Sequence, residues 1–189
     1  GGSTPLNFFD RLSQQELDWS KVTVTLADER WVPPEHPDSN QKLVQEHPMR
    51  NNAATAYLLP IYNNAPSAAS GEQFCHELFG RLGQFDVLVL GMGGDGHTAS
   101  LFPEATRLEE GLNLKSGRQA IAIDPVTAPH ERMSLTLARL LRSDQIIVHI
   151  TGKEKKEILE EALTTKDKRK LPIAAVLQQD ETPTTIYWS

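Results

Sequence analysis

Short apolar runs alternate along this chain with longer segments whose apolar residues recur every three to four positions. Nearly continuous runs of aliphatic and β-branched residues are typical of strands buried on both faces. They predict strands over residues 22–26, 85–90, 119–123, 145–150, 173–177 and 184–188. The amphipathic segments predict helices over residues 5–14, 39–47, 70–82, 135–142 and 153–163. Thr4 is the expected cap of the first helix, with Pro5 at its first helical position.

Strands that alternate with helices predict an α/β fold, a three-layer sandwich built on a mostly parallel sheet. The length of 189 residues suits a single domain over residues 1–189. Ligands of such sheets lie beyond the carboxyl ends of the strands. The segments that directly follow the strands are therefore the ones to examine for chemistry.

Composition narrows the possible partners and the compartment. The formal net charge of −6 argues against a nucleic-acid partner, which would need a basic face. The sequence contains neither a membrane-length apolar run nor a signal-peptide pattern, so we expect no membrane partner and a cytoplasmic location. Cys75 is the single cysteine, which fits a reducing compartment, and it shares a helix face with Phe79. We expect Cys75 to be a core residue.

The richest motif is LGMGGDGHT, at residues 90–98, where a strand runs into a loop with four glycines. The backbone N–H groups of Gly93 and Gly94 are candidate donors to an oxyanion or phosphate. The glycines also match the dinucleotide fingerprint, with Asp124 as a conceivable ribose ligand. Against this alternative, Pro103 interrupts the segment where the dinucleotide helix should continue.

His97 is the strongest single candidate for chemistry. It follows the glycine loop at the end of a strand, with Asp95 two residues away to orient its ring. The remaining histidines have no such setting, and we interpret them as structural: His36, His47, His76, His130 and His149.

The segment ADERWVP, at residues 27–33, places three charges at the end of another apolar strand. Arg30 offers a planar fork for a carboxylate, a phosphate or a polarised carbonyl, and Asp28 lies beside it. A surface cluster of salt bridges explains the same pattern equally well. The sequence leaves the two interpretations open.

Two further segments suggest phosphate contacts. Lys155, in the segment TGKEK, continues the buried stripe of the helix over residues 153–163 toward the strand ends. A lysine near a helix N-terminus is unfavourable unless an anion lies there. Lys153 and Lys156 are more simply surface charges. The opening GGSTP could cradle a phosphate through Gly2, Ser3 and Thr4, although a flexible linker has the same composition.

No spacing typical of metal ligands, of a nucleotide-binding P-loop or of a serine nucleophile occurs along the chain. We therefore expect no metal and no cofactor. Together, GGSTP, ADERWVP, LGMGGDGHTASLFP, a PxxRxSLTLxxL segment containing Arg132, and TGxxK resemble the 6-phosphogluconolactonase family in content and order. The related glucosamine-6-phosphate deaminases share the glycine loop but typically have Asp-Glu-Tyr in place of Asp28-Glu29-Arg30.

The resemblance implies a Rossmann-like fold and hydrolysis of 6-phospho-D-glucono-1,5-lactone to 6-phosphogluconate in the pentose phosphate pathway. It implies His97 as the catalytic residue, with Asp28, Arg30 and Asp95 as polar residues of the active site. Its phosphate-binding positions match Gly2, Ser3, Thr4, Arg132 and Lys155. In this family the GGSTP loop follows a strand, so we expect a central first strand upstream of Gly1 and a chain that is incomplete at its N-terminus.

The expected partner is a phosphorylated sugar lactone, handled by a monomer or a weak homo-oligomer. His97 would act as a general base on water, the glycine-loop amides or Arg30 would stabilise the oxyanion, and Arg132 with Lys155 would hold the phosphate. Two alternatives remain. A sugar-phosphate sensor would have no use for a histidine beside a glycine loop, and an NAD-linked oxidoreductase would be revealed by cofactor binding.

Overall fold

The structure, a computed structural model, describes residues 4–189, and their strands pair into three sheets. A parallel sheet has the order β4–β7–β8 (Phe85–Leu90, Ser143–Ile150 and Thr184–Trp188). A second parallel pair joins β1 (Thr23–Thr25) to β3 (Tyr57–Leu59). An antiparallel sheet has the order β2–β6–β5 (Asp28–Arg30, Arg132–Leu135 and Ala120–Ile123).

The predicted α/β class with mostly parallel pairing is confirmed, and the strands over 85–90 and 184–188 lie where the sequence predicts them. Strands β2, β3 and β6 were not predicted. β2 and β6 carry charged or polar residues, so they lack the continuous apolar run of a buried parallel strand. β3 is apolar but only three residues long, and Pro60 follows it directly. The segment over 119–123 is a strand, but it pairs in the antiparallel sheet.

Helices occur in all five regions where the amphipathic pattern predicts them. They are α1 (Leu6–Leu12), α2 (Asn40–Glu46), α3 (Ala68–Arg81), α5 (Leu137–Leu140) and α6 (Lys153–Ala162). The side chain of Ser39 caps α2 by accepting a hydrogen bond from the N–H of Lys42. The expected cap at Thr4 is wrong: the N-cap of α1 is Pro5, and no side chain caps that helix. Helix α4 (Leu108–Leu112) was not predicted.

Residues 173–177 form a helix, α7 (Ile173–Leu177), so the prediction of a strand there is wrong. Ile173, Ala174, Ala175 and Val176 are all buried, and a short segment buried on every side shows neither helical nor strand periodicity. Pro172, with φ of −57°, precedes the first turn and favours the helix.

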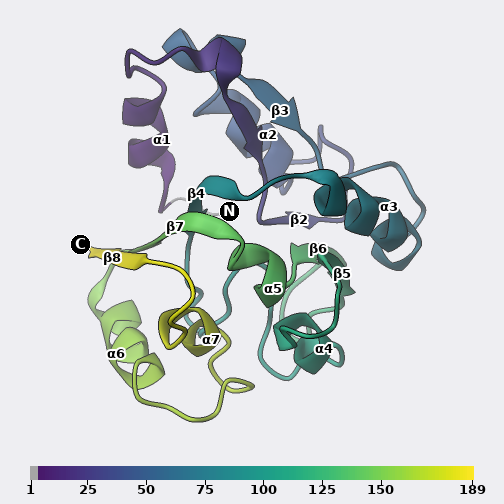
Figure 1. The fold of residues 1–189 in the computed structure, drawn as a ribbon, viewed down its shortest axis with the longest axis vertical. Coiled ribbons are helices and arrows are strands. Elements are labelled where there is room, and N and C mark those ends of the chain that lie inside the picture. The colour runs from purple at the N-terminus through teal and green to yellow at the C-terminus, as the bar shows by residue number, and fades with distance from the viewer. Residues whose placement is uncertain (1–3) are drawn as a thin grey trace.

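The helices cover both faces of the central parallel sheet. Figure 1 shows α6 and α7 on one side of β4–β7–β8 and α1 on the other, as a layered sandwich requires. The apolar core runs through these strands and α7, and Cys75 and Phe79 of α3 are part of it, as the sequence predicts. Leu163 does not continue the buried stripe of α6, because it lies at the C-cap and is 45% exposed.

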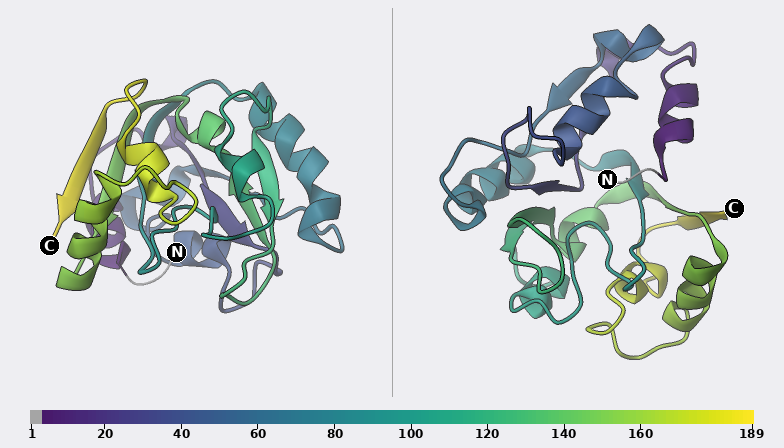
Figure 2. Two further views of the ribbon diagram at one scale, coloured as in Figure 1. Left: turned by 90° about the horizontal axis from the view of Figure 1, so that it is seen from below. Right: turned by 180° about the vertical axis from the view of Figure 1, so that it is seen from behind.

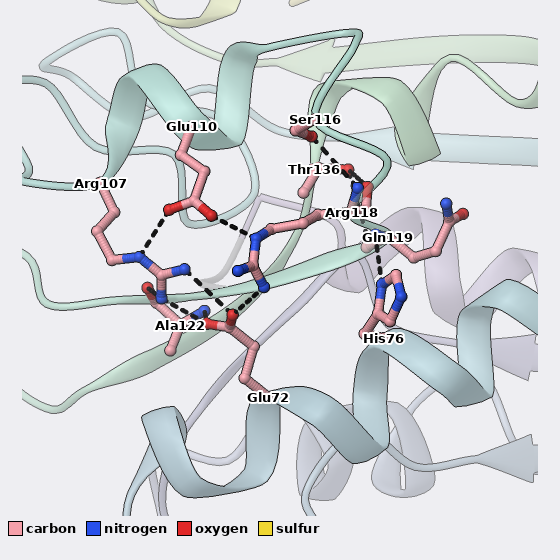
Figure 3. Close-up of polar contacts among 9 residues, drawn as sticks. All are labelled: Glu72, His76, Arg107, Glu110, Ser116, Arg118, Gln119, Ala122 and Thr136. Atoms are coloured by element: carbon pink, nitrogen blue, oxygen red, sulfur yellow. Dashed lines mark hydrogen bonds and ion pairs between the residues drawn. The ribbon is translucent and has the colours of Figure 1, made fainter.

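A cluster of charges joins α3 to β5 and α4 (Figure 3). The buried carboxylate of Glu72 on α3 accepts hydrogen bonds from Arg107, from Arg118 and from the backbone N–H of Ala122. Glu110 pairs with both arginines on their other side. Burial raises the pKa of Glu72, but these bonds outweigh it and hold the pKa below its ordinary value. Since its charges are matched internally, the cluster is structural.

Strand β4 pairs only with β7, and β1 only with β3, among the described residues. Val87 on β4 is 55% exposed. The expectation of a central strand upstream of Gly1 stays a prediction. Among residues 4–189, helices are too short or too polar to cross a membrane. Figure 2 gives two further views of the sheets and the helices around them.

Candidate functional site

The glycine loop begins at the carboxyl end of β4 and packs against α7 and the residues just before it. Gly96 has a φ of +79°, and a β-carbon there would lie 2.5 Å from the side chain of Leu171. Its carbonyl accepts a hydrogen bond from the N–H of Ile173 at 3.0 Å. The hydroxyl of Thr98 donates to the carbonyl of Gly91 at 2.9 Å. The loop is therefore a rigid support for His97.

His97 and Asp95 form a hydrogen-bonded pair. His97 Nδ1 lies 2.5 Å from Asp95 Oδ1, and the same oxygen accepts the backbone N–H of His97 at 3.1 Å. Burial raises the pKa of Asp95, but the bonds from His97 outweigh it and leave the pKa below its ordinary value. An ionised Asp95 only accepts hydrogen bonds, so Nδ1 carries the proton and Nε2 has the free lone pair.

Gly93 leaves room for the His97 ring. A β-carbon at Gly93 would lie 2.2 Å from the imidazole, whereas one at Gly94 would meet nothing within 4 Å. The N–H of Gly93 donates to the carbonyl of His97 at 2.9 Å, so that amide is already used within the loop. Gly94 is exposed, and its N–H has no backbone acceptor among residues 4–189. Of the two predicted oxyanion donors, Gly94 has the available amide.

The segment that follows His97 joins it to the antiparallel sheet. The ring of Phe102 stacks on the His97 imidazole with centroids 4.2 Å apart, and the guanidinium of Arg132 lies 5.6 Å from the Phe102 centroid. The hydroxyl of Ser100 donates to Asp28 Oδ2 at 2.6 Å. Residues from β2, from β6 and from the loop after β4 therefore meet in one site, and Phe102 and Ser100, which sequence reasoning did not single out, connect them.

Arg30 and Arg132 face each other across the antiparallel sheet, as direct partners in the β2–β6 register. Within the described chain neither guanidinium has a carboxylate within 4.0 Å. Arg30 donates to the carbonyl of Asp38 and to Asn40 Oδ1. Arg132 is only 6% exposed, and its Nε has no partner. Burial and the charge of Arg30 lower the pKa of Arg132. Two arginines without a carboxylate partner within 4.0 Å in this part of the chain, residues 4–189, are candidates for binding an anion.

The charged segment at residues 28–30 is not a surface cluster of salt bridges. Glu29 is fully buried, and its carboxylate accepts the N–H groups of Arg30, Asn40 and Gln41 and the hydroxyl of Ser39. Burial raises the pKa of Glu29. Glu29 thus anchors the start of α2 beside the site. This role depends on tertiary contacts and leaves no signal in the local sequence.

Lys155 lies in the first turn of α6, directly after β7. Because β7 runs parallel to β4, the loop after each strand emerges at the same edge of the sheet. Lys155 is half-buried, whereas Lys153 and Lys156 are exposed. Lys156 stacks on Trp188, with Nζ 4.5 Å from the ring centroid. These positions fit the predicted division between one inward lysine and two surface lysines, but no contact joins Lys155 to His97.

The remaining predicted phosphate positions are at the N-terminus. Thr4 lies in the turn before α1, with no side-chain hydrogen bond to cap that helix. Gly2 and Ser3 lie outside the described residues, so their predicted role stays a prediction.

The dinucleotide interpretation conflicts with the backbone after the glycine loop. Residues 94–103 form turns and a bridge between Thr98 and Leu101 in place of a helix. A separate groove of about 570 Å³, between β3 and α3, is lined by aromatic and small residues such as Tyr57, Tyr62 and Phe74. It contains no carboxylate, imidazole or basic side chain. The chemistry therefore concentrates around His97 and Arg132.

The fold and this site define an α/β protein with a hydrogen-bonded His97–Asp95 pair and, near the strand ends, an arginine without a carboxylate partner among the described residues. A family described as glucosamine-6-phosphate isomerases/6-phosphogluconolactonase matches residues 1–188. The chain belongs to this family.

Similar proteins align along nearly the whole length of this chain. The protein named 6-phosphogluconolactonase from Rhizobium meliloti is 44% identical over 190 residues, covering 100% of this chain and 82% of its own length. The one from Pseudomonas aeruginosa is 40% identical over 189 residues, covering 100% and 78%. The crystal structure of a 6-phosphogluconolactonase from Shewanella baltica has a TM-score of 0.96 and 42% identity, covering 100% and 81%. A monomeric glucosamine-6-phosphate deaminase, 19% identical with a TM-score of 0.79 and coverages of 98% and 82%, shares the fold.

Proposed function

We propose that this protein is a 6-phosphogluconolactonase, which hydrolyses 6-phospho-D-glucono-1,5-lactone to 6-phospho-D-gluconate. The observation that carries the proposal is the single ring of Phe102, which stacks on His97, the partner of Asp95, and has the guanidinium of Arg132 5.6 Å from its centroid. A candidate base and a candidate anion-binding group thus lie on one aromatic ring. The relatives that cover the whole chain at 40% identity or more, and are named 6-phosphogluconolactonases, support the same activity.

His97 acts as the general base in this proposal. Its Nε2 lone pair takes a proton from a water molecule as the water attacks the lactone carbonyl. Asp95 holds the ring and stabilises the imidazolium that forms, because its carboxylate stays ionised against Nδ1–H. A lactone carbonyl is already electrophilic, so the attack requires neither a covalent intermediate nor a Lewis acid.

The tetrahedral intermediate needs a donor for its oxyanion and a proton for its leaving oxygen. The exposed N–H of Gly94 and the guanidinium of Arg30 are the candidates for the first role. Protonated His97 fills the second by returning its proton to the ring oxygen as the carbon–oxygen bond breaks. The product is the open-chain acid, and His97 is neutral again.

In this proposal, binding of the phosphate group orients the substrate in the site. Arg132 donates through one Nη to the carbonyl of Pro129, and its other Nη has no partner among the described residues, so that nitrogen is the candidate donor to a phosphate oxygen. Lys155 is the second candidate cation, joined by Gly2, Ser3 and Thr4 through backbone and hydroxyl donors. We place the reaction in the cytoplasmic pentose phosphate pathway, where this lactone arises.

A direct assay tests the function. Purified protein is mixed with freshly generated 6-phosphogluconolactone, and acid release is followed against the spontaneous rate. The proposal expects hydrolysis far above the spontaneous rate and saturating with substrate. Failure to exceed the spontaneous rate would reject the lactonase, and tight binding without turnover would favour a sugar-phosphate sensor. A fluorescence titration with NAD, expected to give no saturable signal, tests the oxidoreductase alternative.

A further inference from the structure

Three metal-ligating side chains gather outside the site around His97. His36 and Asp38 belong to the loop after β2, and His130 belongs to the loop before β6. One ligand atom from each residue lies within 4.8 Å of the other two. His130 Nε2 is 2.9 Å from Asp38 Oδ2, and His36 Nδ1 is 3.9 Å from the same oxygen. The two loops are far apart along the chain, so sequence spacing gives no hint of the cluster.

We propose that His36, Asp38 and His130 form a binding site for a divalent transition-metal ion of the zinc type. Two imidazoles and one carboxylate are a common ligand set for such ions, with the remaining positions left for water. Donor atoms around a tetrahedral zinc lie roughly 3.3 Å apart, given metal–ligand bonds of about 2.0–2.1 Å. Two of the donor separations, 2.9 and 3.9 Å, lie on either side of that value, and the third is within 4.8 Å, so side-chain rotations would have to draw the ligands together to complete the site.

The backbone holds the three ligands in place. His130 has a φ of +67°, in the left-handed region that a side chain with a β-carbon rarely adopts. This conformation accompanies the approach of its imidazole to Asp38. The carbonyl of Asp38 accepts from Arg30, which holds the backbone beside the cluster. The lone pair of His36 Nδ1 accepts the N–H of Asp38 at 3.1 Å, so an ion bound at Nδ1 would replace this hydrogen bond.

The neighbouring charges select the class of ion. Arg30 contacts the backbone of Asp38, and Arg132 lies two residues beyond His130. Two guanidiniums this close disfavour calcium or magnesium, whose binding depends on an excess of negative oxygen ligands. Zinc, cobalt and nickel ions bind neutral imidazole strongly and tolerate a less negative site.

A metal at this position would join the two loops that extend the β2–β6 pair. Arg30 and Arg132 are direct partners in that pair, so the ion would fix the separation of the two guanidiniums. It would take no part in the acid–base chemistry of His97. The ion would therefore be structural: removing it should loosen the link between the two loops and leave His97 in place.

Cobalt binding tests the proposal because Co²⁺ reports its ligands by visible absorption. Titration of the full chain should give a saturable spectrum at one ion per chain, which Zn²⁺ displaces. His36→Gln and His130→Asn should each weaken Co²⁺ binding by at least about tenfold. Asparagine at residue 130 tolerates the left-handed backbone, so this variant should stay folded. The matched control is His47→Gln. His47 Nδ1 also lies near a carboxylate, 3.4 Å from Asp10, but Arg50 pairs with that carboxylate where a metal site would need a third ligand.

Thermal unfolding provides a second readout. Zn²⁺ at about one hundred times its dissociation constant should raise the Tm of the wild-type chain by about 5–10 °C, and should not raise that of His36→Gln. Absence of a saturable Co²⁺ spectrum would overturn the proposal. So would equal binding by the wild type and both ligand variants, or binding that disappears only when His97 is replaced. None of these results depends on lactonase activity.

Discussion

At the scale of single residues, the account rests on how His97 is held. Asp95 bonds its ring from one side, Phe102 stacks against its face, and Gly93 leaves the space that the ring occupies. Each contact restricts the imidazole to one orientation. The proposed chemistry requires that orientation because only Nε2 is free to take a proton.

Gly93 and Gly94 provide a matched pair of substitutions. Gly93→Ala would place a β-carbon 2.2 Å from the His97 ring, while Gly94→Ala would meet nothing within 4 Å. We expect Gly93→Ala to displace the imidazole and lower kcat by about tenfold to a hundredfold. Gly94→Ala keeps its N–H and should stay within about threefold of the wild type. Equal kcat values for the two variants would show that the position of the ring does not matter.

Asp95→Asn tests the orienting role of the carboxylate. The amide can still bond to Nδ1, but it cannot stabilise the imidazolium by charge. We therefore expect kcat to fall less than it does on removal of His97 itself, with KM nearly unchanged. Steady-state kinetics on the phosphorylated lactone measure both. A larger loss than for His97→Ala would make Asp95 the primary base.

At the scale of elements, the site depends on packing that brings three strands together. Helix α7 supports the glycine loop, and Glu72 ties α3 to β5 through the N–H of Ala122 and to α4 through Arg107. Neither contact involves a residue proposed to bind the substrate. Both hold elements that carry or adjoin the functional side chains.

Glu72→Gln should destabilise the fold by about 2–3 kcal/mol at pH 7, because it leaves two arginines without their buried partner. The folded-state pKa of Glu72 lies below its unfolded value, which is about 4.3. Its contribution is therefore fully present above that pH and is lost as the pH falls through the folded-state pKa. Urea unfolding at several pH values measures the difference.

Glu109→Gln is the control for that measurement. Glu109 also pairs with an arginine, but its side chain is 72% exposed and that of Arg169 is 58% exposed. The same chemical change should lower the free energy of unfolding by at most about 1 kcal/mol at this exposed pair. Similar losses in the two variants would show that the buried cluster contributes no more than a surface ion pair.

Arg132 and Lys155 are predicted to hold the substrate phosphate. Arg132→Ala and Lys155→Ala should each raise KM for the phosphorylated lactone by about one to two decades. KM for unphosphorylated gluconolactone should change much less. Arg169→Ala and Lys153→Ala, at exposed positions, are the controls. Equal effects on both lactones would show that neither residue contacts the phosphate.

At the scale of the whole molecule, the sequence predicted the elements better than their arrangement. The runs over 85–90 and 184–188 were recognised because long apolar strands carry their own signal. The strand Asp28–Arg30 and the helix Ile173–Leu177 were not, because tertiary contacts determine them. His97 and Asp95 were found from their place after a glycine loop. Phe102 and Glu29 could not be found this way, since only the folded chain brings them to the site.

The mechanism predicts that lactone hydrolysis needs no metal. Exhaustive EDTA treatment should leave kcat within about twofold of the untreated value, because His97 and water supply the chemistry. Removing an ion bound at His36, Asp38 and His130 would lower thermal stability and leave the base in place. A loss of activity that zinc or magnesium restores would contradict the proposed mechanism.

The most direct test of the central claim is kcat for His97→Ala on 6-phosphogluconolactone. Its control is His76→Ala, which removes an imidazole of α3 that accepts the backbone N–H of Gln119 at 3.2 Å, at the end of β5 away from Arg132. We predict that kcat falls at least about a hundredfold in the first variant with KM nearly unchanged, and stays within about twofold in the second. A His97→Ala variant that retains near-normal kcat would contradict the account.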